Sequence, residues 1–349
     1  MYDRVADRRL RVEDVTAVRH ERETAAGFTR VTTEVRLRGE GAVGRGEDVT
    51  YEAPDHEGFP TERLDLAGSH TLEGFSAALA DHDLFAEPPA QDASRRYRRW
   101  AFESAALDLA LTQAETTLGA ALDRDSDPVR FVVSPSLPDE DGTVSLEPVE
   151  RLLADRPALE LKLDPTPAWD EAVVDALVAT GAVRVLDLKG FYEGLDVGTP
   201  AEPGLYGRVL EAFPDAVIED ARFTDATRDL LEPAASRLSF DYPITGVASI
   251  EDLPIDPEWL NCKPSRFGTV ESLLETIAYC EREGIRLYGG GQFELGVGRD
   301  QIQALAALCY PDGPNDVAPA GYNDPEPAAD LPASPLDVEP GTGFGVPGG

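Results

Sequence analysis

Two patterns of apolar and polar residues divide the chain near residue 129. Residues 1–50 alternate apolar and polar positions between glycine-rich turns, which predicts a meander of β-strands. Residues 71–86 and 93–119 carry apolar residues at helical spacing, which predicts two helices. Beyond about residue 129, short apolar runs alternate with amphipathic helical runs, so a second kind of architecture follows the first.

The second pattern contains about eight strand-and-helix units, and its apolar runs are RFVVSPSL, LELKLD, AVRVLDLKG, DAVIED, RLSFDYP, EWLNCKPS, IRLYGGG and DVAPAG. Repeated alternation of strand and helix predicts a parallel sheet with helices outside, and eight units fit a closed barrel. An open, doubly wound sheet is the alternative. A nucleotide-binding sheet is disfavoured because no glycine fingerprint follows the first strand.

The last 25 or so residues are rich in proline and glycine, which is typical of a disordered tail. Within them, DVEPGTGFGV contains a turn between two short stretches that could form strands. We therefore predict that this segment folds back onto the first part of the chain.

Charge and composition narrow the class of protein. The net charge of −35, from 66 acidic and 31 basic residues, opposes binding to nucleic acid or anionic membranes. Only three basic residues are lysine and 28 (31 − 3) are arginine, which together with the acidity favours a protein from a high-salt cytoplasm. A plain acidic protein is the alternative. No apolar run approaches the roughly 18 residues of a membrane span, no signal peptide is visible, and the three cysteines lack metal-ligand spacing.

All three lysines fall at the ends of predicted strands: Lys162, Lys189 and Lys263. In a barrel of this type the active site lies at the carboxyl ends of the strands. Arginine keeps its proton, whereas burial and neighbouring charges can bring lysine to a working pKa. These lysines are therefore candidate acid–base groups, unless they persist by chance on the surface.

Three carboxylates end consecutive predicted strands: Asp187, Glu219 and Asp241. Neighbouring strands lie about 5 Å apart, so these groups would repel one another unless a hard divalent cation such as Mg²⁺ lay between them. Ion pairing with arginine is the alternative. The four histidines all precede the predicted barrel, so none is expected to act in it as a base or ligand: His20, His56, His70 and His82.

In this order, the motifs resemble those of the enolase superfamily, and within it the muconate lactonizing enzyme subgroup. Gly44 to Glu47 resembles the GxGE turn of the capping domain, and WAFESAALDLALTQAETTLG the helix before the barrel. LELKLD resembles the KxK strand, NCKPSRFG the KPxRxGG strand, GGGQFELGVG the ESGIG turn and PGTGFGV the closing PGLGV segment.

The resemblance implies roles for these residues. Asp187, Glu219 and Asp241 would bind Mg²⁺, and Lys162 and Lys263 would lie on opposite faces of the substrate. One lysine would abstract the proton α to a carboxylate to give an enediolate. The other would deliver a proton, assist a leaving group or stabilise charge. The absence of a barrel histidine argues against the mandelate racemase subgroup.

The chain departs from the family pattern at several positions. Glu160 stands at the first lysine of KxK, Lys189 at a common asparagine, Ala221 at a proline and Thr269 at a glycine. Because positions i and i+2 of a strand face the same way, Lys189 should point into the site beside Asp187. There it would pair with a metal-ligand carboxylate or contact a second anionic group of the substrate.

Two further residues are candidates for auxiliary or substrate-binding roles. Glu294 lies in the turn after the seventh strand. Arg19 belongs to the charged run RHERE, in the segment 18–29 where the family places a specificity loop, although an exposed, ion-paired loop would look the same.

We thus expect an α/β protein: an α+β capping domain (1–125), a modified TIM barrel, (β/α)7β (126–322), and a C-terminal segment returning to the cap (323–349). The expected function is Mg²⁺-dependent abstraction of the α-proton of a small carboxylic acid by a cytoplasmic lyase or isomerase. β-Elimination, as in o-succinylbenzoate synthase, is preferred over cycloisomerisation, racemisation or epimerisation. A non-catalytic metal- or ligand-binding barrel and a Schiff-base aldolase are the alternatives, and the protein could be a homo-oligomer.

Overall fold

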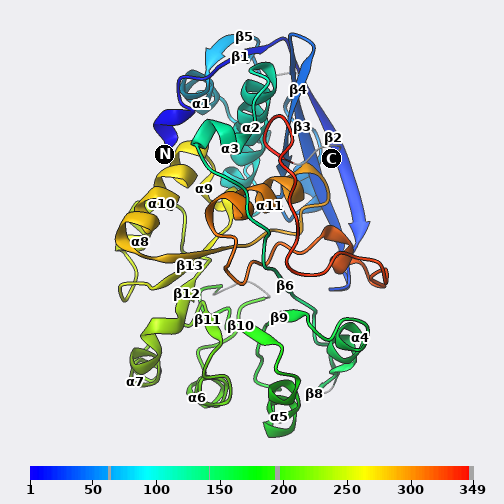
Figure 1. Cartoon of the computed structure of the whole chain (residues 1–349), viewed down its shortest axis with the longest axis vertical. Helices are drawn as coiled ribbons and strands as arrows, with labels where there is room; N and C mark the ends of the chain where they lie inside the picture. Colours follow the sequence, from blue (N-terminus) through cyan, green and yellow to red (C-terminus); the bar gives the residue numbers. More distant parts are fainter. Residues whose placement is uncertain (62–63, 141, 193–196, 346–349) are drawn as a thin grey trace.

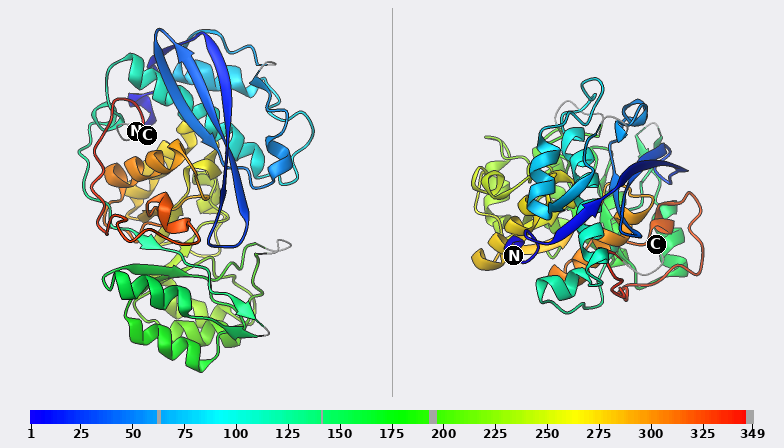
Figure 2. Two further views of the ribbon diagram at one scale, coloured as in Figure 1. Left: turned by 90° about the vertical axis from the view of Figure 1, so that its right-hand side faces the viewer. Right: turned by 90° about the horizontal axis from the view of Figure 1, so that it is seen from above.

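The computed structural model describes residues 1–61, 64–140, 142–192 and 197–345. These residues form two parts, an upper part with an antiparallel sheet and long helix α2, and a lower part of parallel strands surrounded by helices (Figures 1 and 2). Across the described residues, no helix combines the length and apolar character needed to cross a membrane.

The upper part is the α+β cap expected from the sequence. Its main sheet is the antiparallel meander β2 (Asp14–Glu23), β3 (Thr29–Gly39) and β4 (Ala42–Asp48). A second antiparallel pair joins β1 (Arg9–Val12) to β5 (Gly68–Thr71). The helices are α1 (Leu72–Ala80), α2 (Ser94–Gln113) and α3 (Leu118–Leu122), with short 3₁₀ turns at Tyr2–Arg4 and Ala53–His56. The predicted helix over 93–119 is thus two helices.

The interpretation of Gly44 to Glu47 as a turn is wrong, because these residues lie within strand β4. The tight turn comes earlier, at Glu40 and Gly41, whose φ angles are 51° and 79°. The glycines instead allow a close approach to helix α2. A Cβ atom added at Gly44 would lie 2.2 Å from the carbonyl oxygen of Ala105.

The lower part is a parallel sheet in the order β14-β13-β12-β11-β10-β9-β6, with helices outside (Figure 1). The strands are β6 (Val132–Val133), β9 (Glu160–Leu163), β10 (Val183–Asp187), β11 (Val217–Glu219), β12 (Leu238–Phe240), β13 (Trp259–Cys262) and β14 (Arg286–Gly289). A small hairpin, β7 (Asp139–Glu140) and β8 (Thr143–Val144), follows β6.

Helices join successive strands of the barrel, as the alternating sequence pattern predicts: α4 (Glu147–Asp155), α5 (Glu171–Thr180), α6 (Pro203–Ala212), α7 (Arg228–Leu231), α8 (Val247–Glu251), α9 (Pro264–Phe267), α10 (Val270–Glu283) and α11 (Val297–Cys309). Two 3₁₀ turns complete the elements, at Glu232–Arg237 and Ala320–Asn323.

The eighth apolar run, DVAPAG, closes the ring without forming a strand of its own in the described structure. Asn315 makes a single parallel bridge to Phe131, just before β6, and Asp316 bridges Gly290, just after β14. These two residues therefore join the two edges of the seven-stranded sheet. The predicted modified barrel is confirmed, with its last strand reduced to bridges.

The C-terminal residues that the structure describes lie against the cap. Gly343 forms a parallel bridge with Thr117, and the Phe344 N–H donates to Asp108 Oδ1 of α2 at 2.6 Å. The Phe344 ring also packs edge-on against Trp100 of α2. The exact boundaries of cap, barrel and C-terminal segment remain a prediction, and residues 346–349 lie outside the described residues.

Candidate active site

The candidate acid–base and carboxylate residues gather at the carboxyl ends of the barrel strands. Asp187 and Glu219 are the last residues of β10 and β11, and they stand opposite each other in the parallel register. Asp241 and Lys263 directly follow β12 and β13, and Lys162 lies in β9. All five side chains are buried. The parallel sheet therefore brings together residues that are up to 101 positions apart (263 − 162).

Lys162 connects the first two carboxylates. Its Nζ donates to Glu219 Oε1 at 2.6 Å and lies 3.2 Å from Asp187 Oδ2. Asp316, one of the residues that close the barrel, has its Oδ2 3.9 Å from the same ammonium. Lys162 thus faces the carboxylates of two strand ends and of the residue that bridges Gly290.

Glu219 has two further partners that the sequence analysis did not identify. Asn261 Nδ2 lies 3.2 Å from both carboxylate oxygens, and the Tyr288 hydroxyl donates to Oε2. Asn261 precedes Lys263 by two residues, so strand alternation could have placed both side chains on the same face. Tyr288 gave no such signal, because an aromatic residue in a buried strand is ordinary core composition.

Asp241 is held by a second group of donors. Lys263 Nζ lies 2.8 Å from its Oδ2, which also accepts a hydrogen bond from the Tyr192 hydroxyl at 3.1 Å. Arg266, on the short helix after β13, places Nε 3.0 Å from Oδ1. Asp220 orients the backbone here, since its carboxylate accepts the N–H groups of Asp241 and Tyr242 at 2.8 and 3.0 Å.

Lys189 does lie beside Asp187, but not because of strand alternation. Strand β10 ends at Asp187, and Lys189 has a left-handed backbone with φ of 50°. This bend turns the side chain back, so that Nζ lies 2.5 Å from Asp187 Oδ2 and 3.4 Å from Asp164 Oδ2. The backbone N–H of Lys189 donates to Asp187 Oδ1 at 3.1 Å.

The contacts described for the other candidate residues lie outside this group. Glu294 is buried, with Oε2 3.1 Å from Arg299 Nη2 and Oε1 accepting the Gln292 N–H. Arg19 is exposed on β2 and pairs with Glu21 at 3.3 Å. Glu160, at the altered first position of KxK, accepts from Arg130 and Arg184 at 2.5 and 2.7 Å.

Burial and ion pairing act in opposite directions on the pKa values of the site. Burial raises the pKa of Asp187, but Lys189 and Lys162 more than offset it and hold that pKa well below its usual range. The pKa of Asp241 is also held well below its usual range, because Arg266 and Lys263 outweigh the effect of burial. Burial lowers the pKa of Lys162, but Glu219 and Asp187 raise it well above its ordinary value. Asp187 and Asp241 are therefore carboxylates held by ammonium and guanidinium groups, whereas burial raises the pKa of Glu219 to about 7.

The donor set of Asp187, Glu219 and Asp241 fits Mg²⁺, which prefers hard oxygen ligands. All three carboxylates are fully buried at adjacent strand ends, and Asp241 Oδ1 has the Arg266 ion pair beside it but accepts no hydrogen bond. In the arrangement seen, however, their oxygens face the cations and donors of the chain itself. Accordingly, no group of three or more His, Cys, Asp or Glu residues is poised around one metal position in the part of the chain described.

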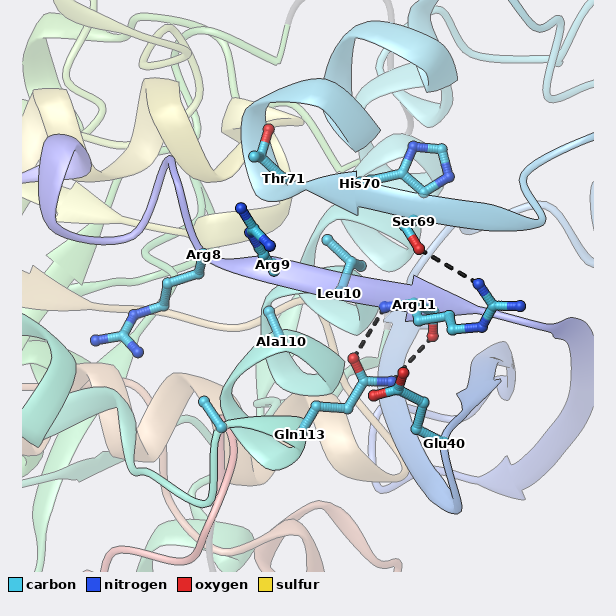
Figure 3. A pocket seen from close by; sticks show the side chains of 11 residues that line it. Arg8, Arg9, Leu10, Arg11, Glu40, Ser69, His70, Thr71, Ala110 and Gln113 are labelled. Carbon is cyan, nitrogen blue, oxygen red and sulfur yellow. Dashed lines mark hydrogen bonds between the residues drawn. The ribbon is translucent and has the colours of Figure 1, made fainter.

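A separate cavity of about 710 Å³ lies in the cap, along the β1–β5 pair (Figure 3). Arg8, Arg9 and Arg11 contribute to its wall, and their side chains diverge from one another (Figure 3). Arg11 is engaged with Ser69 and Gln113. The three lysines and three carboxylates of the candidate site are not among the residues that line this cavity, so the two are separate places in the structure.

Two family models match consecutive parts of the chain. Residues 3–121 match the N-terminal domain, and residues 125–324 the C-terminal domain, of a family described as "domain of unknown function (DUF8230)". No curated protein matches the chain.

Solved structures with the same fold include members of the enolase superfamily. An unknown member from Enterococcus faecalis has 19% identity and a TM-score of 0.71, over 97% of this chain and 95% of that one. Muconate cycloisomerase from Pseudomonas fluorescens has 16% identity and a TM-score of 0.64, over 88% and 87%. Dipeptide epimerase from E. faecalis, complexed with Mg and L-Leu-L-Tyr, has 17% identity and a TM-score of 0.70, over 97% and 99%. The predicted enolase-superfamily fold is confirmed.

Proposed function

The chain belongs to the DUF8230 family, whose description names no activity, and we propose from the site itself that it is a lyase or isomerase of the enolase-superfamily type. It would move the proton on the carbon α to the carboxylate of a small organic acid. The observation that carries this proposal is the pair Lys162 and Lys263, each buried at a strand end and each paired with a carboxylate of the same site.

The two lysines would act on the substrate from different strands of the barrel. One, as the neutral amine, would take the α-proton, and the other, as ammonium, would return a proton or assist a leaving group. Asn261 and Tyr288 would hold Glu219 in place, and Tyr192 and Arg266 would hold Asp241. Burial of these groups would keep water from quenching the carbanionic intermediate.

Mg²⁺ is part of this proposal, with Asp187, Glu219 and Asp241 as the residues that would hold it. When bound, such an ion supplies positive charge that stabilises an enediolate. The neighbouring epimerase, which is described as complexed with Mg and a dipeptide, supports the idea for this fold.

Several outcomes can follow the same proton abstraction. We place β-elimination first, as in o-succinylbenzoate synthase, with cycloisomerisation and racemisation or epimerisation as alternatives. A small carboxylate as substrate and a cytoplasmic location, without nucleic-acid or membrane partners, agree with the strongly acidic composition.

A binding protein without catalytic activity is the second candidate function. The observation that favours it is that the site's carboxylates are already neutralised by Lys162, Lys189, Lys263 and Arg266. Such a protein would bind a carboxylate without exchanging its α-proton, which distinguishes it from the enzyme.

The test is exchange of the α-proton in D₂O, followed by NMR, in molar KCl with Mg²⁺ and a panel of carboxylic acids. We expect the wild-type protein to exchange the α-proton of at least one acid. Lys162→Met and Lys263→Met should each lower the rate by at least about a hundredfold, the usual minimum effect of a positioned general acid or base. EDTA should have a comparable effect.

The control is Arg184→Gln, which removes a cation of the same barrel that contacts Glu160 and not the lysines. It should leave the exchange rate unchanged, and thermal melting should show that every variant is folded. An acid that binds without exchange would favour the binding protein. Exchange that persists in both lysine variants would refute the assignment of these residues.

A further inference from the structure

Lys189 occupies a position between two carboxylates at the rim of the barrel. Its Nζ lies 2.5 Å from Asp187 Oδ2, at the end of β10, and 3.4 Å from Asp164 Oδ2, just after the end of β9. The Lys189 side chain is 17% exposed, whereas that of Asp164 is 55% exposed. The stronger contact is thus made with the fully buried Asp187.

The backbone is shaped to make this contact. Lys189 has a φ of 50°, in the left-handed region that residues with a side chain seldom adopt. The same bend directs its N–H to Asp187 Oδ1 at 3.1 Å, so one residue engages both oxygens of the carboxylate. A rare backbone conformation is retained only where the surroundings compensate for it, and here the compensation is the two-point contact with Asp187.

A divalent cation at this carboxylate would meet the charge of Lys189 directly. Asp187 Oδ2 already lies within 2.5 Å of one ammonium and 3.2 Å of another, that of Lys162. Two positive charges a few ångströms apart repel each other even in water, and they repel more strongly in a buried site, where the effective dielectric constant is lower. A divalent ion must therefore displace the ammonium or bind beside it at a cost.

We propose that Lys189 is a built-in cation that competes with a divalent metal ion for Asp187. The inference rests on the proposed function, because it takes Asp187 as a metal ligand. Asp164 offers the displaced ammonium a second carboxylate within reach of the same residue. Wild-type protein then holds the metal weakly, and metal binding is coupled to movement of Lys189 from Asp187 toward Asp164.

The experiment measures equilibrium binding of Mn²⁺, from the EPR signal of the free ion, in molar KCl and without substrate. Lys189→Met should bind Mn²⁺ at least about tenfold more tightly than the wild type, because one positive charge beside the ligand is removed. Lys189→Gln should do the same, and provides a second variant if Lys189→Met fails to fold. Lys189→Arg, which keeps the cation, should retain the weak binding.

Two controls separate this inference from the metal site itself. Arg184→Gln removes a positive charge from the same strand as Asp187, at a site that contacts Glu160, and should leave the affinity unchanged. Asp241→Asn should weaken binding in the wild type and in Lys189→Met. Equal affinity in wild type, Lys189→Met and Lys189→Gln, with loss in Asp241→Asn, would overturn the role of Lys189 alone. Absence of binding in all of them would overturn the metal site and this inference together.

Discussion

The chemistry of the site depends on individual residues, and the sequence identifies some of them more readily than others. The three lysines stand out because arginine replaces lysine elsewhere in the chain, and the three carboxylates because they end consecutive strands. Tyr288 and Asn261, by contrast, resemble ordinary strand residues, and only the closed barrel brings them to Glu219. Strand alternation predicts that Lys189 lies beside Asp187, and the structure places it there through a left-handed bend instead.

A single buried histidine provides a pH test of the cap. His56 accepts a hydrogen bond from the Thr33 hydroxyl at Nδ1, 2.8 Å away, and donates from Nε2 to the Thr50 carbonyl at 2.9 Å. Both ring nitrogens are thus satisfied in the neutral form. Burial lowers the pKa of His56, and Asp48, with Oδ2 4.0 Å from Nδ1, only partly opposes this.

The direction of the pH effect follows from this shift. In the unfolded chain, His56 takes up a proton at the ordinary histidine pKa of about 6.5. In the folded protein it stays neutral at that pH, because its pKa is lower. The free energy of unfolding should therefore fall as the pH decreases from 7.5 to 5.5. It should fall less in His56→Gln, measured by urea denaturation at both values. An equal loss in the two proteins would show that His56 is not responsible.

At the scale of elements, the packing of β4 against α2 depends on glycine. A Cβ atom at Gly44 would lie 2.2 Å from the Ala105 carbonyl oxygen, and one at Gly46 would lie 2.1 Å from that of Ala101. Both obstacles are backbone atoms of a long helix, which cannot move aside locally. Gly44→Ala should therefore lower the free energy of unfolding by about 1–3 kcal/mol or more, the usual cost of overpacking.

Gly207 supplies the matched control for this substitution. It lies within helix α6, and a Cβ atom there would meet nothing within 4 Å. Gly207→Ala should raise the free energy of unfolding by about 0.5–1 kcal/mol, because alanine is the better helix former. Urea denaturation followed by circular dichroism compares the two variants. Similar effects of the two substitutions would contradict the close packing of β4 on α2.

The sequence predicts helices and strands well where a long pattern repeats. It predicts them less well where the local structure depends on a few residues. Seven barrel strands appear where apolar runs alternate with helices, because each strand is buried on both faces. The eighth run yields only the bridges of Asn315 and Asp316, since two residues suffice to close the ring. Resemblance to the GxGE motif predicts a turn at Gly44 to Glu47, whereas in the structure these glycines lie in β4 and allow close packing against α2.

At the scale of the whole molecule, charge is distributed unequally between interior and surface. Several cations are buried in specific contacts, such as Arg98 with Asp48 and Arg30 with the backbone carbonyls of Val49, Thr50 and Gln292. In the described part of the chain, buried acidic and basic residues largely balance each other, so most of the net charge of −35 falls on the surface, where acidic groups repel one another. This repulsion opposes the folded state at low salt.

Stability should consequently depend on salt in a characteristic way. The Debye length falls from about 10 Å at 0.1 M salt to about 3 Å at 1 M, so most of the repulsion is screened within that range. The melting temperature should rise steeply with KCl up to about 1 M and more slowly above it, as calorimetry can measure. Stabilisation through exclusion of salt from the protein surface would instead keep growing at molar concentrations. A melting temperature that is constant below 1 M KCl would show that the acidic surface does not need salt for stability. The high-salt origin inferred from the lysine-poor, acidic composition would then lose its physical basis.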